Sequence, residues 1–396
     1  MQQNEYRLLA SRAINKIGNV IYDYGNSTWI ANLGIIGQKY LGYYQLAENV
    51  IALILNPIAG AIADRYQRRK ILLWTDFIGA LSCGLLALIA SDRIMLYGLI
   101  TVNALLAISQ AFSGTSFRAY VVTLIDDERL VNFNAHLEII SQIISISSPL
   151  LAFFIVDQLG LRSALIVDSI SFALSFACLF SITKTENHLK QVNETKKLNQ
   201  LGKDITQGLA FIYQEKEMFF LLSIAALANF FIAAFNYLIP FSNQLFANTA
   251  SYASLLSMGA AGSILGAVLA SKLFKNTYQN LLLALGLSGL GLTLMTPMAI
   301  WHLPNLIIVS GNFWFECFLT IFNIHFFSLV QKKVPKVLLG RVFSSIFTIA
   351  VLFMPLATAL MTYLPATVTL SSFAIIGTGI TTMSILAYLY GRKRFL

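Results

Sequence analysis

Four polar residues recur along the first long apolar stretch of the chain at the spacing of a single helical face. They are Asn15, Asn19, Asp23 and Asn26, at positions i, i+4, i+8 and i+11. If this stretch crosses a membrane, these side chains must face the protein interior or a watery cavity, because lipid offers them no hydrogen-bond partner. The stripe therefore predicts a polar cavity that contains a carboxyl group.

A second stripe of similar composition lies far along the chain, at Asn312, Glu316, Thr320 and Asn323. Two weaker pairs fall in other apolar runs, Asn103 with Gln110 and Asn229 with Asn236. Counted from the N-terminus, these are the first, fourth, seventh and tenth runs, so we expect all four to line one cavity. The alternative is that the amides only join neighbouring helices, through hydrogen bonds worth about 1 kcal/mol or less.

The two acids of these stripes, Asp23 and Glu316, are the most costly residues to place in a membrane. A charged acid near the bilayer centre costs on the order of 3 kcal/mol on insertion scales, which argues against an idle group. A buried carboxyl group favours its protonated form, so we predict that one or both acids exchange protons. The alternative is a fixed ion pair, with Lys16 as a candidate partner, or a permanently protonated donor. Glu48 and Asp168 lie near the predicted outer surface, where snorkelling explains them.

The composition places the chain in a lipid bilayer. It has 396 residues, of which 57% are hydrophobic and 11% are charged, whereas a soluble domain carries about 25% charged residues. The net charge of +9 comes from basic loops on one side of the predicted spans, and only Lys39, Arg93 and Arg162 lie in loops of the other side. This bias is an orientation signal that places the basic side in the cytoplasm and argues against nucleic acid as a partner.

Residues typical of enzyme chemistry do not form a recognisable set. Cys83, Cys178 and Cys317 all lie in apolar runs, and no two are close enough in sequence for a metal or redox pair. His136 and His325 also lack metal-ligand spacing. Buried thiols usually behave as small hydrophobic side chains. We therefore predict that the chain is not an enzyme and needs no metal or other cofactor.

Twelve apolar runs have roughly the 20 residues that a helix needs to span the hydrocarbon. They lie near residues 8–37, 41–63, 71–91, 94–117, 132–156, 163–183, 217–243, 250–272, 278–300, 304–330, 341–363 and 366–390. The prediction is an all-α integral membrane protein of two six-helix bundles, 1–183 and 217–396, with both termini cytoplasmic. The linker, 184–216, is polar and then amphipathic, which predicts a helix on the membrane surface. A plain solvated linker is the alternative.

The short loop between the second and third spans is strongly basic and has one acid inside it. It reads Gly-x-x-x-Asp-Arg-x-x-Arg-Arg from Gly60 to Arg69. This pattern resembles the signature loop of the major facilitator superfamily of secondary transporters, except that Gln67 stands where the family usually has glycine. A weaker copy begins at Gly266, after the eighth span, and has Ala270 in the place of Asp64.

The resemblance implies two bundles that alternate about a central cavity. It also implies that the loop latches the two halves on the cytoplasmic side, with Asp64 and Arg68 taking part. Two cations elsewhere in the chain, Arg118 and Arg341, could reach Asp64. A loop that only sets topology is the alternative. The residues assigned to this gating group are Gly60, Asp64, Arg65, Arg68, Arg69, Asp76, Arg118 and Arg341.

Further stretches resemble the branch of this superfamily that includes bacterial macrolide-efflux proteins and the enterobactin exporter. They are Gln110-Ala-Phe, Arg129-Leu-Val-Asn-Phe-Asn-Ala, Asp168-Ser-Ile-Ser-Phe, Val334-Pro and Gly340-Arg-Val-Phe. A proline often found near the end of the fourth span is absent. The branch implies a monomer in the bacterial cytoplasmic membrane that exports an amphipathic small molecule or drug in exchange for protons. The alternative is transport of one defined metabolite, such as a siderophore or a lysophospholipid.

Overall fold

The chain folds into long helices joined by short connections. The computed structural model describes residues 3–63, 66–183, 210, 212–273, 278–334, 342, 346, 349–364 and 366–394. Within these ranges the regular secondary structure is entirely helical, which confirms the predicted all-α class. In the same ranges, nine helices are long and apolar enough to cross a membrane. The predicted linker helix lies almost entirely outside the described residues.

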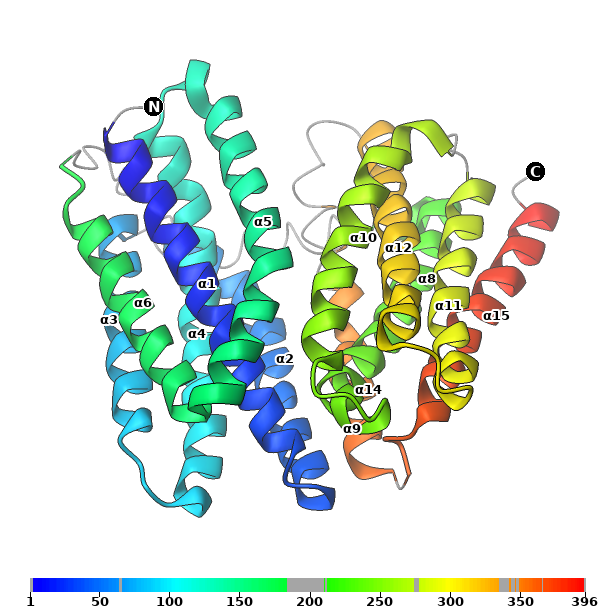
Figure 1. The fold of residues 1–396 in the computed structure, drawn as a ribbon. Coiled ribbons are helices and arrows are strands. Elements are labelled where there is room, and N and C mark those ends of the chain that lie inside the picture. The colour runs from blue at the N-terminus through cyan, green and yellow to red at the C-terminus, as the bar shows by residue number, and fades with distance from the viewer. Residues whose placement is uncertain are drawn as a thin grey trace. The chain divides into compact units, whose positions relative to one another are not determined.

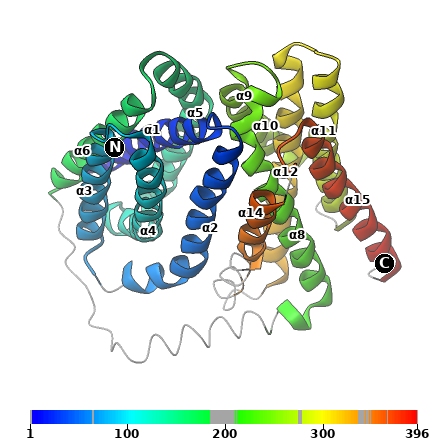
Figure 2. The same cartoon turned by 90° about the horizontal axis from the view of Figure 1, so that it is seen from below.

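The chain divides into two compact units, Met1–Leu198 and Asn199–Leu396. The first unit contains six helices, labelled in Figures 1 and 2: α1 (Gln3–Ala31), α2 (Ile35–Ala63), α3 (Arg68–Ala87), α4 (Asp92–Leu124), α5 (Asp127–Leu159) and α6 (Leu161–Phe180). Helix α2 packs on α4, α4 on α3, α3 on α6, α6 on α1, and α1 on α5. Helices α1 and α2, with 29 residues each, are long enough to span a bilayer, and α1 is the more polar of the two.

The second unit repeats this order of neighbours. Its helices are α8 (Lys216–Leu238), η1 (Ile239–Phe241), α9 (Ser242–Leu245), α10 (Ser251–Leu273), α11 (Tyr278–Ile300), α12 (Asn305–Lys333), α14 (Met354–Tyr363) and α15 (Leu370–Arg394). Helix α10 packs on α12, α12 on α11, α11 on α15, α15 on α8, and α8 on α14. Each pair corresponds to one pair of the first unit, so the two units share one order of helix packing, as expected from the sequence repeat.

Glycine allows the closest of these helix pairings. Gly262 and Gly266 of α10 face the backbone of α12, and a Cβ atom at either position would overlap the carbonyl oxygen of Phe313 or Cys317. Small residues at this spacing let two helix backbones approach and pack in the absence of a hydrophobic driving force between helices. The side chain of His325, also on α12, contacts the backbone carbonyl of Ala270 on α10 at 2.9 Å. This is the packing role expected for that histidine.

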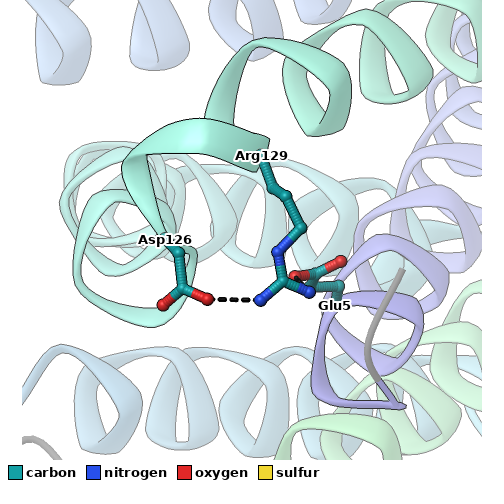
Figure 3. Close-up of polar contacts among 3 residues, drawn as sticks. All are labelled: Glu5, Asp126 and Arg129. Atoms are coloured by element: carbon teal, nitrogen blue, oxygen red, sulfur yellow. Dashed lines mark hydrogen bonds and ion pairs between the residues drawn. The ribbon is translucent and has the colours of Figure 1, made fainter.

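One end of the first unit is fixed by an apolar cluster and an ion pair. The cluster draws buried side chains from α1, α3, α4, α5 and α6, among them Leu8, Leu72, Phe117 and Phe133. Beside it, Arg129 at the start of α5 binds two carboxylates, that of Asp126 and that of Glu5 on α1, the latter at 3.1 Å (Figure 3). Glu5 is only 3% exposed. A carboxylate removed from water in this way needs a charged partner, and Arg129 supplies one.

Candidate functional site

Three acids from three helices line one cavity of the first unit. They are Asp23 on α1, Glu48 on α2 and Asp76 on α3, and the cavity has a volume of about 70 Å³. Among the described residues that line it, none is Lys, Arg or His. The polar residues predicted for the first and fourth spans share the lining with these acids, namely Asn15, Asn19, Asn103 and Gln110. Because the lining carries carboxyl groups but no cation, it attracts protons and other cations.

The hydroxyl group of Tyr44 binds one of the acids that line this cavity. It donates a hydrogen bond to Oδ1 of Asp23 at 3.3 Å, and accepts one from the side-chain amide of Asn26, also at 3.3 Å. The amide of Asn103 on α4 donates to the backbone carbonyl of Tyr44 at 3.0 Å. Tyr44 is 2% exposed and Asn26 is fully buried, whereas the side chain of Asp23 is exposed to the cavity. Tyr44 therefore connects α2 to the polar stripe of α1 and to α4.

A row of hydrogen bonds leads away from the cavity through the interior of the unit. The amide of Asn19 donates to the side-chain oxygen of Asn15 at 2.9 Å, and that of Asn15 donates to Asp76 at 3.2 Å. The hydroxyl group of Ser175, on α6, donates to the other oxygen of Asp76 at 2.5 Å and is shared with that of Ser11 at 2.9 Å. The row joins α1, α3 and α6. Asp76, assigned from the sequence to the gating group, lies in this row and in the cavity lining.

A larger cavity of about 490 Å³ adjoins the first on the side of α5. The two share Asn19, Asp23 and Gln110. The larger cavity contains basic residues: Arg12 and Lys16 of α1 and Arg118 of α4 line it, together with Glu138 of α5.

The ammonium group of Lys16 binds α5 rather than Asp23. It donates hydrogen bonds to the backbone carbonyl of Ser141 and the hydroxyl group of Ser145, both at 2.9 Å. Among the residues that the structure describes, no cation lies within ion-pair distance of Asp23. A fixed Lys16–Asp23 ion pair, one of the alternatives considered from the sequence, is therefore not formed.

In the second unit, Glu316 lies half-buried on α12 and accepts a hydrogen bond from Ser263 of α10 at 3.2 Å. Asn312, one turn earlier, is 3% exposed and donates to the backbone carbonyl of Leu255 at 2.8 Å. That contact joins α10 to α12, which is the packing alternative for this amide. The remaining stripe residues of this unit differ in exposure: Asn229 is half-buried, and Asn236 and Asn323 are exposed.

Two arginines of the gating group bind neighbouring helix ends within the first unit. Arg68 donates to the hydroxyl group of Thr123, at the end of α4, at 2.5 Å. Arg69 donates to the carbonyl oxygens of Leu179 and Phe180 at the end of α6, at 3.1 and 2.6 Å. Both contacts hold α3 against its neighbours at this end.

The other members of the gating group are placed only in part. Gly60 lies in the last turn of α2, and Arg118 is exposed. Asp64, Arg65 and Arg341, and with them the predicted latch, lie outside the described residues.

Sequence reasoning did not assign Glu48 to the acid-lined cavity, and it missed Tyr44, which binds the cavity residue Asp23. Glu48 and Tyr44 are four residues apart on α2, so they share a helical face, and this spacing was the available signal. Asp168, by contrast, is fully buried away from the lining, with its oxygens held by Ser171 at 3.2 Å and by the thiol of Cys83 at 3.5 Å. In the described part of the chain, no group of three or more His, Cys, Asp or Glu residues is arranged to hold a metal ion.

Membrane-length helices, a duplicated packing arrangement and polar cavities between the helices together define a membrane transport protein. A sequence profile of the Major Facilitator Superfamily matches residues 40–358. The chain belongs to that family, as the loop at Gly60 predicted, and it is a transporter rather than an enzyme.

Individual relatives place the chain within this family. It is 25% identical to macrolide efflux protein A of Streptococcus pyogenes over 320 residues, which cover 76% of this chain and 75% of that protein. It is also 25% identical to macrolide efflux protein A of Enterococcus faecalis over 339 residues, 81% of this chain and 98% of that protein. These similarities confirm the predicted likeness to the macrolide-efflux branch.

Solved structures share the fold. A bacterial homologue of the iron transporter ferroportin in its inward-facing state has a TM-score of 0.75 and 16% identity, with 98% of each chain covered. A D-xylose–proton symporter has a TM-score of 0.69 and 13% identity, covering 97% of this chain and 95% of the other. At this identity the likeness shows the fold alone.

Proposed function

We propose that the protein is a proton-coupled exporter that works by alternating access and carries an amphipathic small molecule out of a bacterial cell. In this proposal it is a monomer in the cytoplasmic membrane with twelve spans and both termini in the cytoplasm. The spans form bundles 1–183 and 217–396, joined by the cytoplasmic linker 184–216. Protons enter the cell as the substrate leaves.

The observation that carries the proposal is the cavity shared by Asp23, Glu48 and Asp76. Three carboxyl groups around one small space without a basic residue repel one another when all are ionised, so the site binds and releases protons as its surroundings change. Asp23 and Glu48 are both exposed, and Asp23 also lines the larger cavity. Asp76 has both oxygens occupied by Asn15 and Ser175. Asp23 is therefore the acid that we assign to proton exchange.

Protonation of Asp23 has a direct structural consequence. The ionised carboxylate accepts a hydrogen bond from Tyr44, whereas a protonated carboxyl group is a weaker acceptor and can itself donate. A proton on Asp23 thus changes the link between α1 and α2 and biases the balance between two conformations of the protein. Glu316, held by Ser263 in the second unit, is the second acid that we propose for this role.

We propose that the loop after α2 shifts the same equilibrium, between two conformations of the protein, from the cytoplasmic side. In this part of the proposal, Asp64 pairs with Arg118 or Arg341 when the cavity opens outward, and loss of that pairing lets the cytoplasmic side open. The contacts of Arg68 and Arg69 with the ends of α4 and α6 favour this role, because they hold the start of α3, which follows the loop, against its neighbouring helices. Asp64→Asn with normal expression and lost turnover would favour a latch, and unchanged turnover would favour a topological role.

The named relatives make a macrolide the first substrate to test, since both are macrolide efflux proteins at 25% identity. A second candidate function is transport of one defined metabolite. The larger cavity favours it, because a lining with Arg12, Lys16 and Arg118 offers charge–charge recognition, which suits a single charged ligand better than a range of neutral drugs.

The test is transport by the purified protein in sealed vesicles with an imposed pH gradient. A radiolabelled macrolide reports substrate movement, and a pH-sensitive dye reports proton movement in the same vesicles. We expect Asp23→Asn and Glu316→Gln, each made singly, to lose gradient-driven accumulation. Asp157→Asn is the matched control, because Asp157 is an exposed acid at the end of α5.

Three outcomes decide the matter. Loss of both signals in Asp23→Asn, with the control unchanged, supports proton coupling through this acid. Full activity in the Asp23→Asn, Glu316→Gln double variant would remove both acids from the coupling step. Macrolide flux that continues without any gradient would point to a passive channel and contradict alternating access.

A further inference from the structure

The lining of the larger cavity of the first unit carries one more cation than acids. Three cations line it, Arg12, Lys16 and Arg118, and two acids, Asp23 and Glu138. These charged residues lie on α1, α4 and α5. Apolar side chains of the same helices also line the cavity, namely Phe117, Val20, Leu137, Ile140 and Ile144. A cavity of about 490 Å³ with this mixture has the size and character of a small-molecule site.

Three of these charged groups already have partners. Lys16 donates to Ser141 and Ser145 on α5, and Glu138 accepts a hydrogen bond at 2.7 Å from Gln142. At the far side, Asp23 accepts from Tyr44. None of these three provides a hydrogen-bond acceptor for the guanidinium groups of Arg12 and Arg118.

Arg12 is the more constrained of the two arginines. Its guanidinium carbon lies 5.2 Å from the centre of the Phe117 ring, and the side chain is half-buried. Stacking on an aromatic face contributes about 0.5–2 kcal/mol, but leaves the five N–H groups of arginine without acceptors. The oxygens of the nearby acid Asp76 accept from Asn15 and Ser175, and among the described residues Asp76 forms no ion pair with Arg12.

Arg118 faces the same space from α4. It is exposed, and it forms no hydrogen bond or ion pair with any side chain that the structure describes. Two guanidinium groups that share a cavity and lack acceptors repel each other, so an anion placed between them gains from both. Arginine binds carboxylate and phosphate through two parallel N–H groups, which makes it well suited to such an anion.

We propose that this cavity binds the anionic group, a carboxylate or a phosphate, of an amphipathic ligand. Arg12 and Arg118 hold the anion, Lys16 adds positive charge from α1, and the apolar wall receives the rest of the molecule. The inference rests on the second candidate function, transport of one defined metabolite, because it names the chemical class of that molecule. It distinguishes that molecule from a neutral drug and from one that carries only positive charge.

The experiment measures binding at equilibrium, without any pH gradient. The full-length protein is placed in phosphatidylcholine nanodiscs, and octyl phosphate is titrated by calorimetry, with empty nanodiscs subtracted. Octyltrimethylammonium is the matched probe of opposite charge. We expect saturable binding of octyl phosphate and much weaker binding of the cation.

Variants assign the binding to the two arginines. Arg118→Gln and Arg12→Gln should each weaken octyl phosphate binding by about tenfold or more, as expected for loss of a charge-assisted hydrogen bond. Arg118→Lys should retain part of the affinity, because it keeps the charge but not the fork of donors. Arg93→Gln is the control, since Arg93 is an exposed arginine near the start of α4. Arg118 is exposed too, so its variants are expected to fold even if Arg12→Gln does not.

The outcomes separate this inference from the proposed function. Equal or tighter binding of octyltrimethylammonium, or unchanged octyl phosphate binding in Arg118→Gln, would overturn the anion site. A protein that binds octyl phosphate but moves nothing against a gradient fails only as a proton-coupled exporter. Nanodiscs that contain phosphatidylglycerol identify the source of the anion. Competition by that lipid assigns the site to a lipid headgroup, and its absence assigns the site to a soluble ligand.

Discussion

The hydroxyl group of Tyr44 lies 3.3 Å from Oδ1 of Asp23 and ties the middle of α2 to the middle of α1. The two side chains differ in their surroundings, because Tyr44 is buried and Asp23 is open to the cavity. A change of charge on the carboxyl group of Asp23 therefore acts directly on Tyr44, which belongs to a different helix. Through this hydrogen bond, Asp23 on α1 is connected directly to α2.

Removing that hydroxyl group should slow transport without unfolding the protein. We expect Tyr44→Phe to lower gradient-driven transport roughly 2- to 10-fold, the range that corresponds to a hydrogen bond of about 0.5–1.5 kcal/mol. The matched control is Tyr40→Phe, because Tyr40 pairs with Tyr97 through the hydroxyl groups near the start of α2, at 3.1 Å. Equal transport rates in the two variants would argue against a role for Tyr44.

The ion pair between Arg129 and Glu5 should contribute measurably to stability. Arg129→Gln leaves a carboxylate that is 3% exposed without this cation, and we expect a loss of about 2 kcal/mol in the free energy of unfolding. Glu5→Gln in the same background should restore part of the loss, because the buried charge is gone. Thermal unfolding in detergent measures both effects. Glu128→Gln, an exposed neighbour, should change stability by less than about 0.5 kcal/mol.

The close pairing of α10 with α12 makes two glycines intolerant of any side chain. Gly262→Ala or Gly266→Ala forces the new methyl group into the backbone of α12, and overpacking of this kind costs about 1–3 kcal/mol. Gly114→Ala is the control, since nothing lies within 4 Å of a Cβ atom at that position of α4. A melting temperature that falls equally in all three variants would show that close approach is not the cause.

Orientation in the membrane can be tested by cysteine labelling in whole cells. In a background with Cys83, Cys178 and Cys317 replaced, we expect a cysteine at Tyr66 to react with a membrane-impermeant maleimide only after permeabilisation. A cysteine at Asp92 should react in intact cells. Both positions are exposed and lie at opposite ends of α3. The reverse pattern of labelling would place the basic loop outside and contradict the assignment based on positive charge.

The fold was predictable because membrane helices leave a strong pattern in sequence. Apolar runs of sufficient length located the helices, and the similarity of the segments at Gly60 and Gly266 indicated a repeat that the packing order bears out. The pattern was weaker at α1, where polar residues interrupt the apolar run.

The site was predictable only where its residues fall on one helix. The spacing of Asn15, Asn19 and Asp23 located the part of the cavity lining that α1 contributes. Spacing could not show that Asp76 is bound by Asn15, which is 61 positions away in sequence, because that contact depends on how α1 packs on α3 and α6. Similarly, Asn312 belongs to a stripe whose spacing predicted a cavity-lining face, and yet its side-chain amide donates a hydrogen bond to the backbone of α10.

The hydrogen-bonded row from Asn19 through Asp76 to Ser11 crosses three helices without a break. Closely packed interiors with saturated polar contacts resist gradual deformation. Helices α1, α3 and α6 therefore form the stiff frame of the first unit. Spin labels attached to α1 and α3 would keep one separation throughout the transport cycle, and such a pair would serve as an internal ruler against which the displacement of every other helix can be measured.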